Sequence, residues 1–187
     1  EAPVLPTGGR RGMAAARHVA DGDASEVAVV TLDGPRKWRR VDWVDVVAFG
    51  RLFASSVMFV LRDERDDSPD AFSRAERMSL LGDGVWRYGR RWPGTEIFDG
   101  RARIVSVNLV EELTAWLVKE APTPYGWLDP DWPEDVAFLR EDGSVLFESV
   151  AHERMSGLCL TPRELIALES AYGRLRSRFR RRSGAHG

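Results

Sequence analysis

Apolar positions in the second half of the chain fall into two short runs that meet at a tight turn. The runs cover 136–139 and 145–150, and Asp142-Gly143 lies between them. An Asp-Gly pair between apolar runs is typical of a β-hairpin, because glycine supplies the positive φ that a tight turn requires. The sequence therefore predicts a hairpin over these residues.

A helix start follows the hairpin. After a short apolar strand at 158–160, Thr161 is placed as an N-cap, Pro162 as the first helical residue and Glu164 as the partner in a capping box. We expect the helix to run to about Arg180. Its buried stripe is formed by apolar residues at three- and four-residue spacing: Leu165, Leu168, Tyr172, Leu175 and Phe179.

The first half of the chain alternates short strands and helices. Alternation over 26–32 predicts a strand, followed by a second strand at 38–41 and a helix over 43–54 capped by Asp42. The run 57–61 is apolar without interruption, which is typical of a central strand buried on both faces.

Residues 62–70 are polar and acidic, and they lack the residue spacing of a calcium-binding loop. We expect a helix that starts at Ser68-Pro69 and runs to Leu81, then strands at 85–88, 95–98 and 103–109, and a helix over 110–119. Together with the hairpin, these elements predict an α+β fold, with a largely antiparallel or mixed sheet packed with a few helices and a C-terminal amphipathic helix.

The chain is expected to hold one domain. Residues 1–24 show no stable period and are expected to be a disordered leader, with Met13 as the natural start and 1–12 as upstream sequence. Residues 25–180 form the single domain, and 181–187 are a basic flexible tail.

Composition narrows the class of partner. The net charge of −2 over 187 residues gives no overall attraction to nucleic acid or anionic membrane. Of the 27 basic residues only two are lysines, a bias that we interpret as the mark of a GC-rich, actinobacterial genome. A single cysteine, Cys159, fits a core position in a cytoplasmic protein, and the region 43–61 is too often interrupted by polar residues to span a membrane. No motif predicts a cofactor.

The acidic groups near the hairpin are the first candidate site. Asp129, Asp131 and Glu134 precede the hairpin, and His152 follows it, so folding could bring carboxylates and an imidazole together as in a metal-dependent hydrolase. Turn formation explains the same residues, and we favour it. No catalytic residue and no metal ligand is assigned.

Arginines near the C-terminus are the second candidate. Six arginines occupy nine positions and would attract phosphate if they were exposed, so a nucleic-acid-associated accessory protein is one alternative. A charged helix end also explains them, and we favour this interpretation. The six are Arg174, Arg176, Arg178, Arg180, Arg181 and Arg182.

Tryptophans provide the third candidate. The chain has seven, and several lie in or beside turns, where a large aromatic side chain can anchor a partner protein. Prolines on both sides of Trp127 and Trp132 favour an extended surface segment. The expected partner-binding surface is acidic and aromatic: Tyr125, Trp127, Asp129, Asp131, Trp132, Glu134 and Asp135.

Three sequence stretches carry a resemblance to known proteins. W-P-E-D-V-A-F-L-R-E-D-G-S at 132–144, A-H-E-R at 151–154 and T-P-R-E-L at 161–165 resemble the C-terminal part of small uncharacterised bacterial proteins, some of them similar to immunity proteins of contact-dependent toxin systems. The resemblance covers about 125–170 and implies no catalytic residues. We therefore expect a non-enzymatic protein-binding module of immunity or regulatory type, whose acidic and aromatic surface covers a basic site on another protein.

Overall fold

A computed structural model of the chain describes residues 28–31, 38–62, 69–128, 131–177 and 180–181. The expected leader at 1–24 and the part of the expected tail after Arg181 lie outside the described residues. The described chain is a single α+β domain, in which an antiparallel sheet is covered by helices, so the predicted fold class is confirmed.

The main sheet has eight strands, and each strand is antiparallel to its neighbours. In sheet order they are β10 (Arg180–Arg181), β1 (Ala28–Thr31), β9 (Met155–Leu160), β8 (Val145–Val150), β7 (Glu134–Leu139), β2 (Ser56–Arg62), β6 (Ala102–Asn108) and β3 (Val85–Gly89). A separate two-stranded ribbon pairs β4 (Arg91–Trp92) with β5 (Thr95–Glu96). Hairpin β7–β8 confirms the hairpin prediction, and Gly143 in its turn has a φ of 79°.

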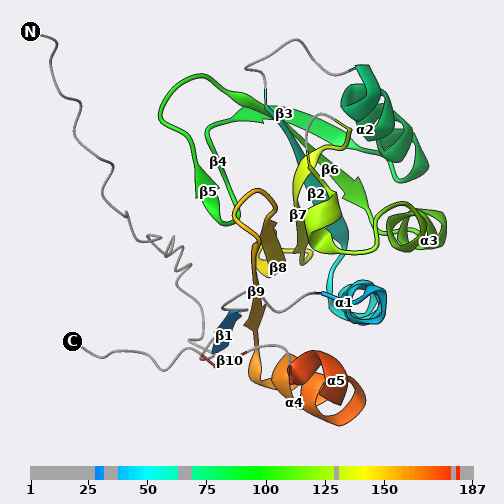
Figure 1. The fold of residues 1–187 in the computed structure, drawn as a ribbon, viewed down its shortest axis with the longest axis vertical. Coiled ribbons are helices and arrows are strands. Elements are labelled where there is room, and N and C mark those ends of the chain that lie inside the picture. The colour runs from blue at the N-terminus through cyan, green and yellow to red at the C-terminus, as the bar shows by residue number, and fades with distance from the viewer. Residues whose placement is uncertain (1–27, 32–37, 63–68, 129–130, 178–179, 182–187) are drawn as a thin grey trace, which may run out of the picture.

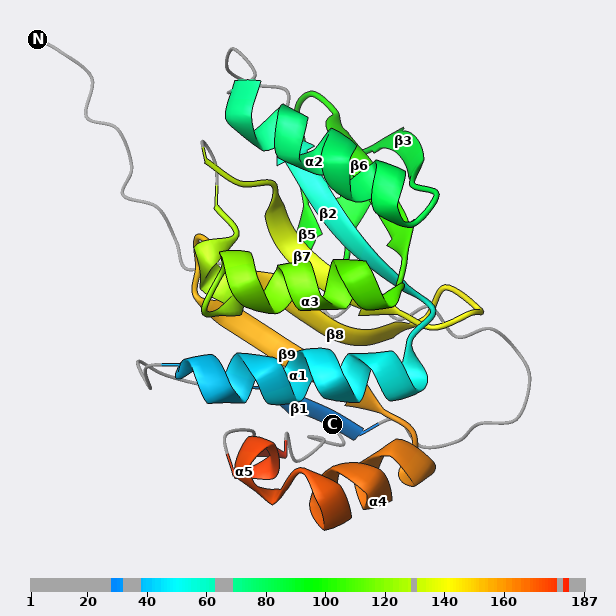
Figure 2. The same ribbon diagram turned by 90° about the vertical axis from the view of Figure 1, so that its right-hand side faces the viewer.

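The two faces of the sheet are covered differently. Figure 2 shows the helices side by side across one face, and Figure 1 shows the β4–β5 ribbon on the other. The helices, in the order in which they cross the sheet, are α2 (Pro69–Leu81), α3 (Glu111–Glu120), α1 (Arg40–Phe53) and α4 (Pro162–Ala171), with the one-turn α5 (Gly173–Arg176) beside α4. A 3-10 turn, η1 (Pro124–Gly126), follows α3.

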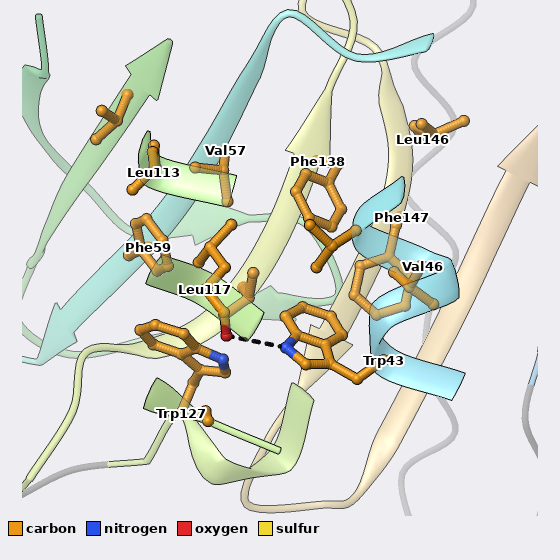
Figure 3. Packing of buried hydrophobic residues seen from close by; sticks show 14 of the residues in the cluster. Trp43, Val46, Val57, Phe59, Leu113, Leu117, Trp127, Phe138, Leu146 and Phe147 are labelled. Carbon is orange, nitrogen blue, oxygen red and sulfur yellow. Dashed lines mark hydrogen bonds between the residues drawn. The ribbon is translucent and has the colours of Figure 1, made fainter. Parts of the chain in front are cut away.

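Strand β2 is buried on both faces, as its continuous apolar run predicts. Phe59 belongs to the core beneath the helices, while Met58 and Val60 belong to a smaller core beneath the β4–β5 ribbon. In the larger core the Trp43 indole ring of α1 packs against the Phe138 ring of β7 (Figure 3). The Trp43 indole N–H also donates to the Leu117 carbonyl oxygen of α3 at 3.2 Å, which ties two covering helices together.

The strand predicted at 38–41 is wrong, because helix α1 already begins at Arg40. Asp42 is therefore a residue of the first turn and not the N-cap. Its carboxylate accepts a hydrogen bond from the backbone N–H of Arg39 at 3.0 Å and another from the Arg39 guanidinium at 2.9 Å. A carboxylate at this position stabilises the helix start as the N3 member of a capping box does.

The C-terminal helix is shorter than predicted. Its start is confirmed, since the Thr161 and Glu164 side chains form the capping box and Pro162 is the first helical residue. The helix ends at Ala171, and Tyr172 leaves the helical region with a φ of −125° and a ψ of 42°. The Tyr172 ring packs edge-on against Phe49 of α1 at 5.5 Å, and Leu175 of α5 is buried in the same core. This break lets the chain turn back and add β10 beside β1.

A buried ion pair connects the hairpin to α4. The Arg140 guanidinium donates to both carboxylate oxygens of Glu164, at 2.7 and 2.6 Å, and to the carbonyl oxygens of Val145 and Cys159 at 2.6 Å. Burial by itself raises the pKa of Glu164, but the hydrogen bonds from Arg140 and Thr161 outweigh it and hold that pKa below its usual range. Glu164 thus stays ionised and serves the helix cap and the ion pair together.

We expect Arg140→Met to lower the free energy of unfolding by about 3–5 kcal/mol, because it leaves the buried Glu164 carboxylate without its cation. Urea denaturation measures the change. The double variant Arg140→Met/Glu164→Gln is the control: it removes the stranded charge while keeping a capping side chain, so it should be more stable than the single variant. Equal stability of the two variants would contradict this account.

Candidate functional site

The structure corrects the expectation that Trp127 contacts a partner. Trp127 is 0% exposed, and its ring packs against Phe59, Trp116 and Trp132 at centroid distances of 5.3, 5.7 and 5.0 Å. Its indole N–H has no acceptor among the described residues, so burial of the ring alone holds it in place. Trp132 is partly exposed, but the Arg74 guanidinium lies 3.8 Å from its ring centroid.

The other members of the expected surface differ in their exposure. The Tyr125 hydroxyl lies 3.0 Å from the Ser156 hydroxyl, within hydrogen-bonding distance, and burial raises the pKa of Tyr125. Asp131 is exposed, whereas Glu134 and Asp135 are buried. Asp129 lies outside the described residues. Residues 125–135 therefore do not form one continuous acidic and aromatic surface in the part of the chain that is described.

Folding does bring acidic groups and His152 together, as the sequence suggested it could. One ligand atom from each of Glu134, Asp135 and His152 lies within 4.8 Å of the others. Glu134 and Asp135 come from the start of β7, and His152 from the turn after β8. Asp131, which the metal-site alternative included, is not part of it.

A cation from the protein itself already lies in this cluster. The Arg62 guanidinium at the end of β2 is 3.0 Å from a Glu134 carboxylate oxygen, 3.8 Å from Asp135 and 3.2 Å from the Nδ1 atom of His152. Because Arg62 supplies positive charge to both carboxylates, it takes the role that a metal ion would have there. The geometry favours an internal ion-pair cluster over a metal-dependent hydrolytic site.

Asp135 holds the β4–β5 ribbon against the sheet. Its carboxylate accepts a hydrogen bond from the Trp92 indole N–H at 2.8 Å and another from the backbone N–H of Ala151 at 2.9 Å. Its backbone has a φ of 53°, which is unfavourable for a residue with a side chain, and it lies where the β2–β7 register shifts. The bonds made by the carboxylate compensate for this strained conformation.

Two further titratable groups lie on the side of the sheet that the β4–β5 ribbon covers. Burial raises the pKa of Glu148 on β8, and this carboxylate forms no hydrogen bond or ion pair with another described residue. Burial, together with the nearby Glu148 charge, raises the pKa of the Cys159 thiol to about 11. Cys159 is therefore protonated at neutral pH and is a poor nucleophile. Its side chain is only partly buried, so it does not occupy the full core position expected from the sequence.

Two of the C-terminal arginines, Arg174 and Arg176, form ion pairs with acidic residues. The Arg174 guanidinium lies 3.2 Å from the Asp45 carboxylate of α1, and Arg176 lies 3.4 Å from Glu169 of α4. Arg180 and Arg181 belong to β10, which is not helical. Arg178 and Arg182 lie outside the described residues.

The sequence did not identify a hollow beside the edge strand β3. The hollow has a volume of about 330 Å³, and its lining residues come from α2, β3 and β6: Phe72, Glu76, Trp86, Arg87, Tyr88 and Arg103. Val85 and Tyr88 of this strand are 67% and 62% exposed. One sequence signal could have indicated this hollow. Adjacent apolar residues in a short strand, here Val85 and Trp86, place apolar side chains on both of its faces.

Comparisons with known proteins add no relative, since no family model, no curated protein and no solved structure matches the chain. No helix in the described part of the chain combines the length and the apolar character needed to cross a membrane.

We expect Asp135→Ala to lower the free energy of unfolding by about 3–5 kcal/mol. The substitution leaves the Trp92 indole N–H and the Ala151 backbone N–H without their acceptor, and it removes a buried counter-ion of Arg62. Chemical denaturation measures the change. Asp131→Ala is the matched control, since the same substitution at an exposed acid nearby should alter stability by less than about 0.5 kcal/mol. A similar small change at Asp135 would show that the ribbon is held by other contacts.

We expect Glu148→Gln to raise the melting temperature at pH 7. Because the pKa of Glu148 is raised in the folded state, its contribution to wild-type stability is fully present below the unfolded-state pKa of about 4.3. That contribution is lost as the pH rises through the folded-state pKa. The advantage of the glutamine variant should therefore grow between about pH 4 and pH 7. Thermal melts of both proteins across that range test this, and a constant difference at every pH would refute it.

Proposed function

We propose that the chain is a non-enzymatic protein-binding module of immunity or regulatory type. The observation that supports the proposal is the open edge of the sheet at β3, where exposed apolar side chains flank an aromatic hollow. Exposed apolar patches on a folded domain are typical of sites where another protein binds.

Apolar exposure is concentrated in the segment of the chain that contains β3. Of the nine exposed large hydrophobic residues in the described part of the chain, five lie between Leu80 and Phe98. Leu80 is 84% exposed at the end of α2, just before the turn into β3. A partner that covers this region would remove from water the most exposed apolar side chains of the domain.

The proposed surface differs from the acidic and aromatic segment expected from the sequence. Trp127, Glu134 and Asp135 are buried and hold the interior together, so they have no area to offer a partner. A nucleic-acid-binding function gains no support from Arg174 and Arg176, because both already pair with carboxylates. A cytoplasmic location is part of the same proposal, and it rests on the single cysteine of the chain.

Affinity capture of the tagged protein from a lysate of the organism that encodes it, with and without nuclease, tests the proposal. We expect a stoichiometric protein partner that survives nuclease and is lost from the variant Val85→Ser/Tyr88→Ser. The matched control is Ile166→Ser/Leu52→Ser, because these residues are 68% and 61% exposed but belong to α4 and α1. A partner lost equally from both variants, or recovery of nucleic acid alone, would contradict the proposal.

A further inference from the structure

Strand β3 has one paired edge and one open edge. All five of its residues, Val85–Gly89, are in antiparallel register with β6, and among the described strands β6 is its only neighbour. In an antiparallel strand the backbone N–H and C=O groups of alternate residues point to opposite sides. The outer side of β3 therefore presents backbone donors and acceptors that another extended chain can pair with.

The two faces of β3 have different chemistry. Trp86 pairs with Val105 of the larger core, so Trp86 and Tyr88 lie on the face covered by α2. Arg87 pairs with Ile104 of the smaller core and lies on the opposite face. A strand added to this edge would place every second side chain beside Trp86 and Tyr88, and the side chain between them beside Arg87.

The hollow suits the side chains on the α2 face. Three of its lining residues are aromatic, namely Phe72, Trp86 and Tyr88, and three are charged, namely Glu76, Arg87 and Arg103. The Arg103 guanidinium lies 4.8 Å from the Phe72 ring centroid, and Arg87 of the edge strand borders the hollow although its side chain starts from the other face. The volume of about 330 Å³ is at the lower end of the range of ligand pockets, about 300–1,000 Å³. Apolar or aromatic side chains flanking the central residue of an added strand would lie against these rings.

Arg87 distinguishes between the possible occupants. It is exposed, and it forms no ion pair with another described residue. In the antiparallel pairing that overlaps all five residues of β3 with β3 of a second copy, Arg87 would lie opposite Arg87, and like charges in that position are destabilising. An acidic residue opposite Arg87 is favourable, so charge complementarity selects a different chain with a carboxylate at that position.

We infer that β3 is a docking edge for an extended segment of another protein, which adds as an antiparallel strand and places an acidic residue opposite Arg87 between two apolar residues. The inference rests on the proposed protein-binding function and specifies its geometry. Backbone hydrogen bonds along β3 provide affinity, while Arg87 and the aromatic hollow provide sequence preference.

Two fluorescein-labelled peptides test the inference, TVYEYVT and its charge-reversed counterpart TVYKYVT, by fluorescence anisotropy with the whole chain. We expect wild type to bind the glutamate peptide roughly twofold to fivefold more tightly than the lysine peptide, the range that one cross-strand ion pair produces. For Arg87→Glu we expect the preference to invert. Arg51→Glu, the same charge reversal on α1, is the control and should keep the wild-type preference.

Several results would overturn the inference. Equal binding of the two peptides would show that Arg87 does not determine which residue is preferred opposite it. Loss of the preference for the glutamate peptide in Arg51→Glu as well would show the same. Absence of binding by both peptides would show that the β3 edge does not accept a strand, and a partner still captured from lysate would then dock by another geometry. A wild-type dimer in sedimentation, lost in Val85→Ser/Tyr88→Ser, would identify a second copy as the occupant.

Discussion

The burial of β2 on both faces is the constraint on which the rest of the structure depends. A strand whose successive side chains are all apolar needs cover on each side of the sheet, because period-two alternation sends them in opposite directions. On one side α2 and α3 provide the cover, and the Trp43 indole N–H joins α1 to α3. On the other side the cover within the described residues is the small β4–β5 ribbon, and its Trp92 ring closes the smaller core.

The weaker cover explains the buried polar cluster at the end of β2. A two-stranded ribbon has little stability alone, so it must be fastened to the sheet. Asp135 does this through the Trp92 indole, and Arg62 compensates the buried charge. The acidic residues that suggested a hydrolytic site in the sequence thus hold the interior together, and His152 lies exposed beside them. The cost includes a strained backbone at Asp135 and the desolvation of several charged groups.

The same architecture leaves β3 as the place for recognition. It lies beyond β6 at the end of the sheet, where α2 packs on one face only and the outer backbone edge is unpaired among the described strands (Figure 2). Natural proteins often place a charged residue on such an edge to prevent self-association. Arg87 fits that role, and an arginine that disfavours a second copy also favours an acidic partner strand. The Arg87 side chain can therefore both prevent self-association and favour a particular partner.

The sequence by itself determined the elements whose signals are local. The Asp142-Gly143 hairpin, the Thr161 cap and the apolar run of β2 each depend on residues a few positions apart, and the fold class follows from their order. Tertiary structure alone decided the roles that depend on distant partners. Asp135 meets Trp92 across 43 residues, and Tyr172 ends α4 where it packs against Phe49 of α1. Whether a strand such as β3 is central or at an edge depends on sheet order, which the alternation of its side chains does not encode.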